Sequence, residues 1–236
     1  MILLQYLPEQ QAILCDGLPG LRKALQQVPI TRGVTMLNLV VDRRGRTVGN
    51  TGSSRDISNE IDYQSLMALR RHADYILTSA KTARVEKYRR SRMAPLVLMS
   101  ESGNFDDIPA VVDWEAGPHD SLVYLVREQD GPRDLNIRYS QPWVRVIEFS
   151  EVGKMFSSAN FVVAETGLYL SKILISSGLI QEIAISVVGV RSVPNRAVRR
   201  TLRLLGLDDA TPAYMARVDN TFLVRFRDLK LHALKD

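Results

Sequence analysis

The sequence has little cysteine and no long hydrophobic run. Cys15 is the only cysteine among 236 residues, which excludes an internal disulfide framework and a cysteine metal cluster. No apolar stretch approaches the roughly 20 residues that a membrane-spanning helix needs. The first residues lack a basic segment and carry Glu9 and Asp16, so they do not resemble a secretory signal. These absences predict a cytoplasmic protein that does not enter a membrane.

The sequence also lacks internal repeats, low-complexity tracts and any linker that would divide it. Its apolar fraction of 45% and charged fraction of 24% are those of an ordinary globular protein. The net charge of +5 comes largely from arginine clusters at 43–46, 87–92 and 196–203. No zinc-ligand spacing, aromatic RNA-binding motif or basic-zipper pattern accompanies them, so nucleic acid is not the expected partner. The clusters favour either a phosphorylated small molecule or a solvated basic surface.

The most informative stretch runs from 160 to 189. Its apolar run at 161–164 is short enough for a buried strand, and the tripeptide Glu-Thr-Gly at 165–167 leads into a helical pattern that Gly178 ends. The apolar run at 183–188 predicts the next buried strand. Strand, glycine turn, helix and strand in this order point helix N-terminal amides at an anion, usually a nucleotide phosphate. A phosphate site is therefore predicted directly after the first strand.

The remaining apolar runs predict further strands and helices. Strands are expected at 35–41, 75–78, 95–100, 122–126 and 143–147, with a closing antiparallel pair at 214–218 and 221–226. Helices are expected at 21–27, after an N-cap at Ser58 or Asn59, from residue 83, and at 196–205. The late antiparallel pair argues against a purely parallel sheet. These elements predict an N-terminal extension at 1–33 and a single mixed α/β domain at 34–236.

Three stretches, in this order and spacing, resemble the reductase domain of bacterial bifunctional riboflavin-biosynthesis enzymes. GSSRDIS (52–58) leads into ALRRHADYILTSAKT (68–82), and LVLMSESG (96–103) follows as the next strand. AETGLYLSKILISSGLIQEI (164–183) is similar to the glutamate-glycine turn, helix and strand start of that family. The resemblance covers roughly 35–188. It implies a dihydrofolate-reductase-like three-layer fold with a mixed, mostly parallel central sheet and a C-terminal antiparallel hairpin.

The resemblance also implies an activity. The expected enzyme is an NAD(P)H-dependent pyrimidine reductase that reduces the ribosyl group of 5-amino-6-(5-phosphoribosylamino)uracil, or of a close analogue, to ribityl. The expected cofactor is NADPH, with NADH as the alternative, and relatives of this kind form homodimers. Two other hypotheses stay open: a catalytically lapsed protein that binds a nucleotide or an intermediate, and a reductase of a different pterin-like heterocycle.

The family's site residues can be carried over where this sequence matches the family pattern. The residues implied in substrate binding are Ser54, Arg70 and Glu165. The residues implied in cofactor binding are Thr82, Glu86, Ser100, Gly167, Leu168, Tyr169 and Leu170. No residue is identified as catalytic, and no metal is expected.

Several of these residues have a purely structural alternative. Arg70 could lie along the outer face of its helix, and Thr82 could be a helix N-cap. Function is favoured at Glu165, because an unpaired buried carboxylate is costly. Asp62 is interpreted as a first-turn helix charge and not as a ligand. Tyr169, besides its place in the cofactor turn, is interpreted as a packing residue.

The sequence departs from the family pattern at five places, one of them Gly189, which replaces the proline expected after the next strand. Arg44 replaces the aspartate of the first loop, and Lys81 replaces a turn glycine. Glu101 occupies the position at which the family often has an arginine that binds the 2′-phosphate of NADPH, and Thr166 replaces a second glycine. A carboxylate at residue 101 would repel that phosphate, although Lys81 could supply the lost charge. We therefore expect poor discrimination between NADPH and NADH.

Overall fold

The computed structural model describes residues 1–7, 12–118, 120–127, 134–207, 210–227 and 229. The strands are β1 (Ile2–Leu7), β2 (Ala12–Cys15), β3 (Val34–Asp42), β4 (Tyr75–Ser79), β5 (Leu96–Ser100), β6 (Val123–Arg127), β7 (Val144–Glu148), β8 (Phe161–Glu165), β9 (Glu182–Val188), β10 (Pro212–Val218) and β11 (Thr221–Phe226). The helices are α1 (Gly17–Gln26), α2 (Glu60–Arg70), α3 (Ala80–Val85), α4 (Pro109–Val112), α5 (Leu135–Arg138), α6 (Phe149–Ser157), α7 (Leu168–Ser176) and α8 (Asn195–Leu205), with a short 3₁₀ helix, η1 (Ser54–Asp56).

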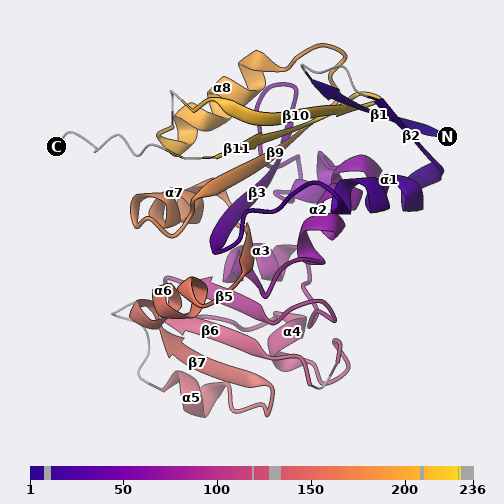
Figure 1. The fold of residues 1–236 in the computed structure, drawn as a ribbon. Coiled ribbons are helices and arrows are strands. Elements are labelled where there is room, and N and C mark those ends of the chain that lie inside the picture. The colour runs from indigo at the N-terminus through magenta and orange to yellow at the C-terminus, as the bar shows by residue number, and fades with distance from the viewer. Residues whose placement is uncertain (8–11, 119, 128–133, 208–209, 228, 230–236) are drawn as a thin grey trace.

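One continuous sheet joins all the described strands, in the order β2-β1-β10-β11-β9-β3-β8-β4-β5-β6-β7 (Figure 1). The neighbours from β9 to β7 are parallel to one another. The neighbours from β9 to β2 are antiparallel, and they include the hairpin of β10 and β11. The predicted mixed, mostly parallel sheet with a C-terminal antiparallel hairpin is therefore confirmed.

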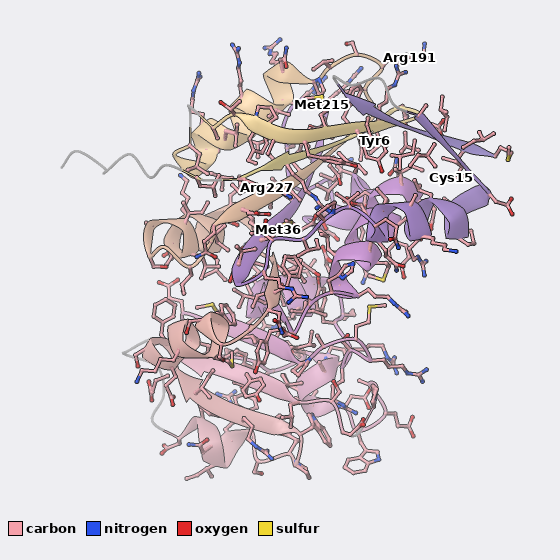
Figure 2. All side chains as sticks on the ribbon, in the orientation of Figure 1. Tyr6, Cys15, Met36, Arg191, Met215 and Arg227 are labelled. Carbon is pink, nitrogen blue, oxygen red and sulfur yellow. The ribbon has the colours of Figure 1, made fainter. Side chains whose placement is uncertain are left out.

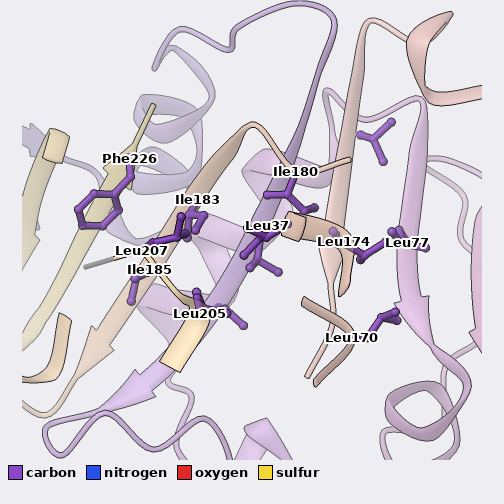
Figure 3. Close-up of a cluster of buried hydrophobic side chains, with 14 of the residues drawn as sticks. Leu37, Leu77, Leu170, Leu174, Ile180, Ile183, Ile185, Leu205, Leu207 and Phe226 are labelled. Atoms are coloured by element: carbon purple, nitrogen blue, oxygen red, sulfur yellow. The ribbon is translucent and has the colours of Figure 1, made fainter. Parts of the chain in front are cut away.

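Helices cover both faces of this sheet, which gives three layers (Figure 1). Because side chains alternate along a strand, β3 contributes to both layers. Leu37 packs with the buried residues of α6, α7 and α8, among them Leu174 (Figure 3). Met36 points to the opposite layer and packs with buried residues of α2, α3 and α4, among them Leu69. The central strands are thus buried on both faces, as parallel strands between two helical layers must be.

The first 33 residues contribute more structure than the one short helix expected there. The helix α1 begins at Gly17 instead of residue 21, and two strands precede it. Strand β1 pairs antiparallel with β10, and Tyr6 and Met215 lie on these adjoining strands (Figure 2). Leu4 of β1 is fully buried, so burial against the rest of the sheet, more than local pattern, stabilises this short run. Residues 8–11 of the expected extension lie outside the described residues.

Several further helices differ from the sequence-based expectation, and the short helices α4 and α5 were not predicted. The helix α3 begins at Ala80, not at residue 83, because Ser79 caps it by accepting a hydrogen bond from the Thr82 amide. The helix α6 was not predicted, although the sequence holds its signal. Glu148 and Glu151 form a reciprocal capping box at its start. Within the described part of the chain, no helix is long and apolar enough to span a membrane.

Candidate functional site

A cavity of about 1320 Å³ opens where the parallel strands end. Its wall includes Ser79, Ser100 and Glu165, the last residues of β4, β5 and β8. All ten residues that the resemblance implied in binding line this one cavity: Ser54, Arg70, Thr82, Glu86, Ser100, Glu165, Gly167, Leu168, Tyr169 and Leu170. The sequence positions are spread over more than a hundred residues, and the fold brings them together.

The strand order explains why the cavity lies there. Strand β8 is inserted between β3 and β4, so the chain runs from β3 through α2 to β4, and later from β8 through α7 to β9. The two crossover helices lie in opposite layers of the fold. At such a reversal the loops diverge and leave a crevice outside the carboxyl ends of the strands, which is where open α/β sheets bind ligands.

The centre of the cavity is a group of the buried Glu165 with the partly buried Arg70 and Tyr88. Arg70 donates from Nε to Glu165 Oε1 at 2.7 Å and from Nη2 to Glu165 Oε2. The Tyr88 hydroxyl donates to Glu165 Oε2 at 2.5 Å and accepts from Arg70 Nη2 at 3.2 Å. The Arg70 and Glu165 side chains are 20% and 7% exposed. A forked arginine–carboxylate contact of this kind fixes both side chains in one geometry.

These contacts hold Arg70 and Tyr88 each in one protonation state. Burial opposes the charge on Arg70, but the adjacent Glu165 carboxylate outweighs it and raises the pKa of the guanidinium. Burial, with the Glu165 charge added, raises the pKa of the Tyr88 hydroxyl well above its ordinary value. Arg70 therefore stays cationic, and Tyr88 stays a neutral hydrogen-bond donor.

Two sequence-based interpretations change here. Glu165 was favoured as functional because an unpaired buried carboxylate is costly, yet it is paired with Arg70, 95 residues away. Arg70 does not lie along the outer face of its helix, because its guanidinium points into the cavity wall toward Glu165. Tyr88 was not identified, and no local spacing marks it, since only tertiary structure places it beside these two residues.

Glu86 and Ser54 also contact each other directly. Glu86 Oε1 accepts from the Ser54 hydroxyl at 2.6 Å and more weakly from Ser53 Oγ at 3.3 Å. The Arg55 guanidinium donates to the Glu86 carbonyl at 2.5 Å. Ser54, which the resemblance implied in substrate binding, and Glu86, which it implied in cofactor binding, therefore link η1 to the end of α3. This contact sets the shape of one cavity wall.

Thr82 and Ser100 lie on the wall formed by β4, α3 and β5. The alternative that Thr82 is an N-cap is wrong, because Ser79 Oγ accepts from the Thr82 amide at 3.0 Å and donates to Thr82 Oγ1 at 2.9 Å. Ser100 Oγ makes two long contacts, each at 3.4 Å, with Ser102 Oγ and the Asn104 carbonyl. Its hydroxyl is thus weakly held and remains at the cavity surface.

The turn after β8 has the predicted form. Gly167 is the N-cap of α7 and offers no side chain to its amides, and the helix begins at Leu168. The first N–H groups of a helix lack intrahelical acceptors, so the N-terminus of α7 has the geometry of an anion-binding site. A Cβ placed on Gly167 would meet no atom within 4 Å, so the turn faces open space. Tyr169 is 67% exposed, which shows that its interpretation as a packing residue is wrong.

Cationic side chains outnumber anionic ones around the cavity. The cationic residues in its described lining are Arg55, Arg70, Lys81, Arg84, Lys87, Arg89, Arg90 and Arg92, and the anionic ones are Asp62, Glu86, Glu101 and Glu165. Eight against four leaves an excess of four positive charges. The predicted preference for a phosphorylated ligand agrees with this balance.

Arg90 is an exception within this basic lining. It is only 3% exposed, and its guanidinium stacks 4.2 Å above the Trp143 ring. It donates to five main-chain carbonyls, those of Ala110, Asp113, Trp114, Gly117 and Pro118. Neither interpretation of the 87–92 cluster, phosphate binding or a solvated surface, therefore holds for Arg90, which organises the segment after α4.

No protein-family model and no curated protein sequence matches this chain. Solved structures do match it. A pyrimidine reductase-like protein from Corynebacterium diphtheriae has a TM-score of 0.65 over 89% of this chain and 99% of its own, at 14% identity. RibD from Acinetobacter baumannii has a TM-score of 0.62 over 84% of this chain, at 16% identity, and this chain spans 59% of it. Rib7, a riboflavin biosynthesis reductase from Saccharomyces cerevisiae, has a TM-score of 0.54 over 87% of this chain and 94% of its own, at 12% identity.

These matches concern the fold. At 12–16% identity they show that the chain folds as these reductase structures do, which agrees with the three-layer fold and mixed, mostly parallel sheet described above. Function depends on the site and not on the fold that carries it. The residues in the cavity must therefore support any assignment of activity.

Proposed function

We propose that this protein is an NAD(P)H-dependent reductase of the riboflavin-biosynthesis type. Its substrate is 5-amino-6-(5-phosphoribosylamino)uracil or a close analogue, whose ribosyl group it reduces to ribityl. The observation that carries this proposal is the convergence of all ten carried-over binding residues on one cavity at the carboxyl ends of β4, β5 and β8. The cytoplasmic location and the homodimeric state implied by the resemblance belong to the same proposal.

The residues at one end of the cavity fit a dinucleotide cofactor. The bare N-terminus of α7, open at Gly167, suits a pyrophosphate, and Lys81 adds a positive charge at the start of α3. Thr82 and Ser100 offer hydroxyls on the adjoining wall. When bound, NAD(P)H supplies the hydride for the reduction, and the protein supplies binding, orientation and electrostatics.

The Arg70–Tyr88–Glu165 group fits the substrate side. Glu165 Oε2 accepts two hydrogen bonds, from Arg70 and Tyr88, whereas Oε1 accepts one, from Arg70. Because each carboxylate oxygen has two lone-pair directions, Oε1 can accept one further N–H or O–H donor from a ligand. The group thus combines a fixed carboxylate acceptor with a nearby positive charge. Such an arrangement suits a polar ring or sugar that carries a phosphate.

A turnover assay tests the proposed function. Purified protein should oxidise NADPH or NADH only when 5-amino-6-(5-phosphoribosylamino)uracil is present, as measured by the loss of reduced-nicotinamide absorbance. The ribityl product should appear in equal amount. If folded protein oxidises neither nucleotide with that substrate, the proposed activity is wrong.

A lapsed binding protein is the second candidate, and two observations favour it. Arg44 and Glu101 reverse the charge that the family pattern has at those sites, and Glu165 is already neutralised by Arg70. Calorimetry separates the two functions. Binding of substrate and nucleotide without turnover would select the binding protein.

The choice between NADPH and NADH should depend on Glu101. This exposed carboxylate on the cavity rim would repel a 2′-phosphate, so we expect the two dissociation constants to differ by less than about tenfold. Glu101→Arg should then favour NADPH by a further factor of about ten or more, because it replaces repulsion with a charged hydrogen bond. Fluorescence titration with both nucleotides measures this. Glu115→Arg, an equal charge change at an exposed residue outside the cavity lining, is the control and should change neither constant.

A strong NADPH preference in the wild-type protein would contradict this expectation. The 2′-phosphate would then be bound elsewhere, with Lys81 as the first residue to test.

A further inference from the structure

A second cavity, of about 620 Å³, lies between α1 and the antiparallel part of the sheet, and Figure 2 labels Tyr6, Cys15 and Arg227 of its lining. Among the described residues, it shares no lining residue with the first cavity. Its end at Arg227 lies beside Glu182, the first residue of β9, whereas the first cavity opens at the carboxyl ends of the parallel strands. Its volume is within the range of about 300–1,000 Å³ that is typical of small-molecule sites.

Most of the wall of this second cavity is apolar or aromatic. The rings of Tyr6 on β1 and Tyr214 on β10 meet edge to face, with their centres 5.6 Å apart. Ile13 and Leu14 of β2 also line the cavity and are 44% and 59% exposed, so they present apolar surface to a ligand. The other apolar lining residues are Ala24, Val28, Pro29 and Ala213. Such a wall suits a ligand with an apolar body.

Two arginines place positive charge at one end of the second cavity. Arg225 of β11 and Arg227, which follows it, both donate to the carbonyl of Pro29, at 3.4 and 3.3 Å. Their guanidinium groups therefore converge on a residue of the lining. Both distances exceed the usual N–H···O range of about 2.7–3.2 Å, so this one carbonyl does not satisfy two guanidinium groups. The exposed Lys23 and Asp16 of the lining balance each other in charge.

Arg225 lacks a carboxylate partner. Glu182 lies 3.4 Å from Arg227 Nε, whereas no acidic residue in the described part of the chain forms an ion pair with Arg225. Arg225 is only 7% exposed, and arginines this buried are nearly always paired. Burial lowers the pKa of its guanidinium, although Tyr214 and Glu182 oppose that shift. Two arginines against one glutamate leave an excess of one positive charge, which an anion would neutralise.

The Tyr214 hydroxyl is a polar group that the fold leaves unused. It is buried and has no hydrogen-bond partner among the described residues. Burial raises the pKa of this hydroxyl, so it stays a neutral donor. Pro212 pairs with Phe226 and Tyr214 pairs with Arg225, which makes Ala213 the extra residue of a β-bulge. The bulge sets Tyr214 opposite Arg225, whose guanidinium lies 5.6 Å from the centre of the Tyr214 ring.

We propose that the second cavity binds a small organic monoanion, a carboxylate attached to an apolar body of one or two rings. The carboxylate would accept hydrogen bonds from Arg227 and the Tyr214 hydroxyl, with Arg225 beside them as a second positive charge. The apolar body would lie against Tyr6 and the apolar lining. A carboxylate fits the single excess charge better than a phosphate monoester, which carries about 1.5–2 negative charges. This inference does not depend on the proposed reductase function.

Fluorescence titration with 2-naphthoate tests this site, with the neutral 2-naphthamide and the more highly charged 2-naphthyl phosphate as comparison ligands. Ala213→Trp fills the cavity and keeps every charge. Arg227→Gln removes the charge that would bind the carboxylate, and Tyr214→Phe removes only the hydroxyl. Arg32→Gln is the matched control, because Arg32 is exposed and outside both cavity linings. Thermal unfolding is recorded for each variant, because Arg227 also contacts the buried Glu182.

We expect 2-naphthoate to bind the wild type and Arg32→Gln equally, and 2-naphthamide to bind the wild type at least about tenfold more weakly. Arg227→Gln should weaken 2-naphthoate binding about tenfold and Tyr214→Phe about threefold, and Ala213→Trp should abolish it. The inference is overturned if the wild type does not bind 2-naphthoate, or if Ala213→Trp binds it as well as the wild type does. Equal affinity for 2-naphthamide, or tighter binding of 2-naphthyl phosphate, would also overturn it. If Arg227→Gln does not fold, Ala213→Trp decides the result.

Discussion

Replacing Arg70 with methionine should lower the free energy of unfolding by about 3–5 kcal/mol and abolish substrate binding. The substitution leaves the Glu165 carboxylate, 7% exposed, without its cation. Breaking a buried ion pair by removing one partner is strongly destabilising, because the remaining charge has lost both water and its counter-charge. Tyr88 remains as one donor to Glu165, but it brings no charge. Urea unfolding followed by circular dichroism measures the loss.

Arg71→Met is the matched control for this experiment. Arg71 is the next residue, at the end of α2, and it is exposed and outside the cavity lining. Its substitution should change stability by less than about 0.5 kcal/mol, as surface changes usually do. If Arg70→Met were no less stable than Arg71→Met, the Arg70–Glu165 pair would not be the structural centre of the cavity.

Substitution of Glu165, the partner of Arg70, distinguishes the contribution of the negative charge from that of the hydrogen bonds. Glu165→Gln keeps a carbonyl oxygen for Arg70 but removes the negative charge, so we expect a smaller loss of about 1–3 kcal/mol. The fold should persist, while substrate binding or turnover weakens. Unchanged kinetics in this variant would remove Glu165 from the substrate site.

Arg90→Lys should cost about 2–6 kcal/mol of stability, although it conserves the charge. The Arg90 guanidinium donates to five main-chain carbonyls, that of Ala110 within α4 and four in the segment that follows α4. Lysine has three N–H donors, so at least two carbonyls lose their charged hydrogen bond, at about 1–3 kcal/mol each, although those of Ala110, Asp113 and Pro118 keep another donor. Its ammonium also cannot stack as a plane on Trp143, which lies 4.2 Å from the Arg90 guanidinium.

Arg89→Lys is the matched control, one residue away in the same basic cluster. Arg89 is exposed and donates to one carbonyl, that of Glu115. Its substitution should be nearly neutral in the same thermal unfolding experiment. Hydrogen exchange should show faster opening around residues 110–118 in Arg90→Lys alone. Equal stability of the two lysine variants would mean that the carbonyl contacts of Arg90 do not organise that segment.

Much of this architecture was readable from local sequence. The strands observed at 161–165 and 182–188 were predicted at 161–164 and 183–188, because short apolar runs indicate buried strands without reference to the rest of the chain. The bare helix start at Gly167 was predicted for the same reason, since a glycine turn after a strand is a local signal. The convergence of the carried-over residues on one cavity follows from topology. Parallel strands end at one edge, so residues that end different strands meet there.

Tertiary structure alone decided what those residues do once they meet. Arg70 and Glu165 bind each other across 95 residues, and no periodicity relates two side chains on separate elements. Tyr88 donates a hydrogen bond to Glu165, and Asp62 is buried. Arg90 donates hydrogen bonds to main-chain carbonyls more than 20 residues away, such as that of Asp113. The physical reason is the same for all of these residues. The hydrophobic pattern of a sequence indicates which residues lie in water and which in the interior. The partner of a buried charge, in contrast, is set by the three-dimensional packing that brings it within hydrogen-bond reach.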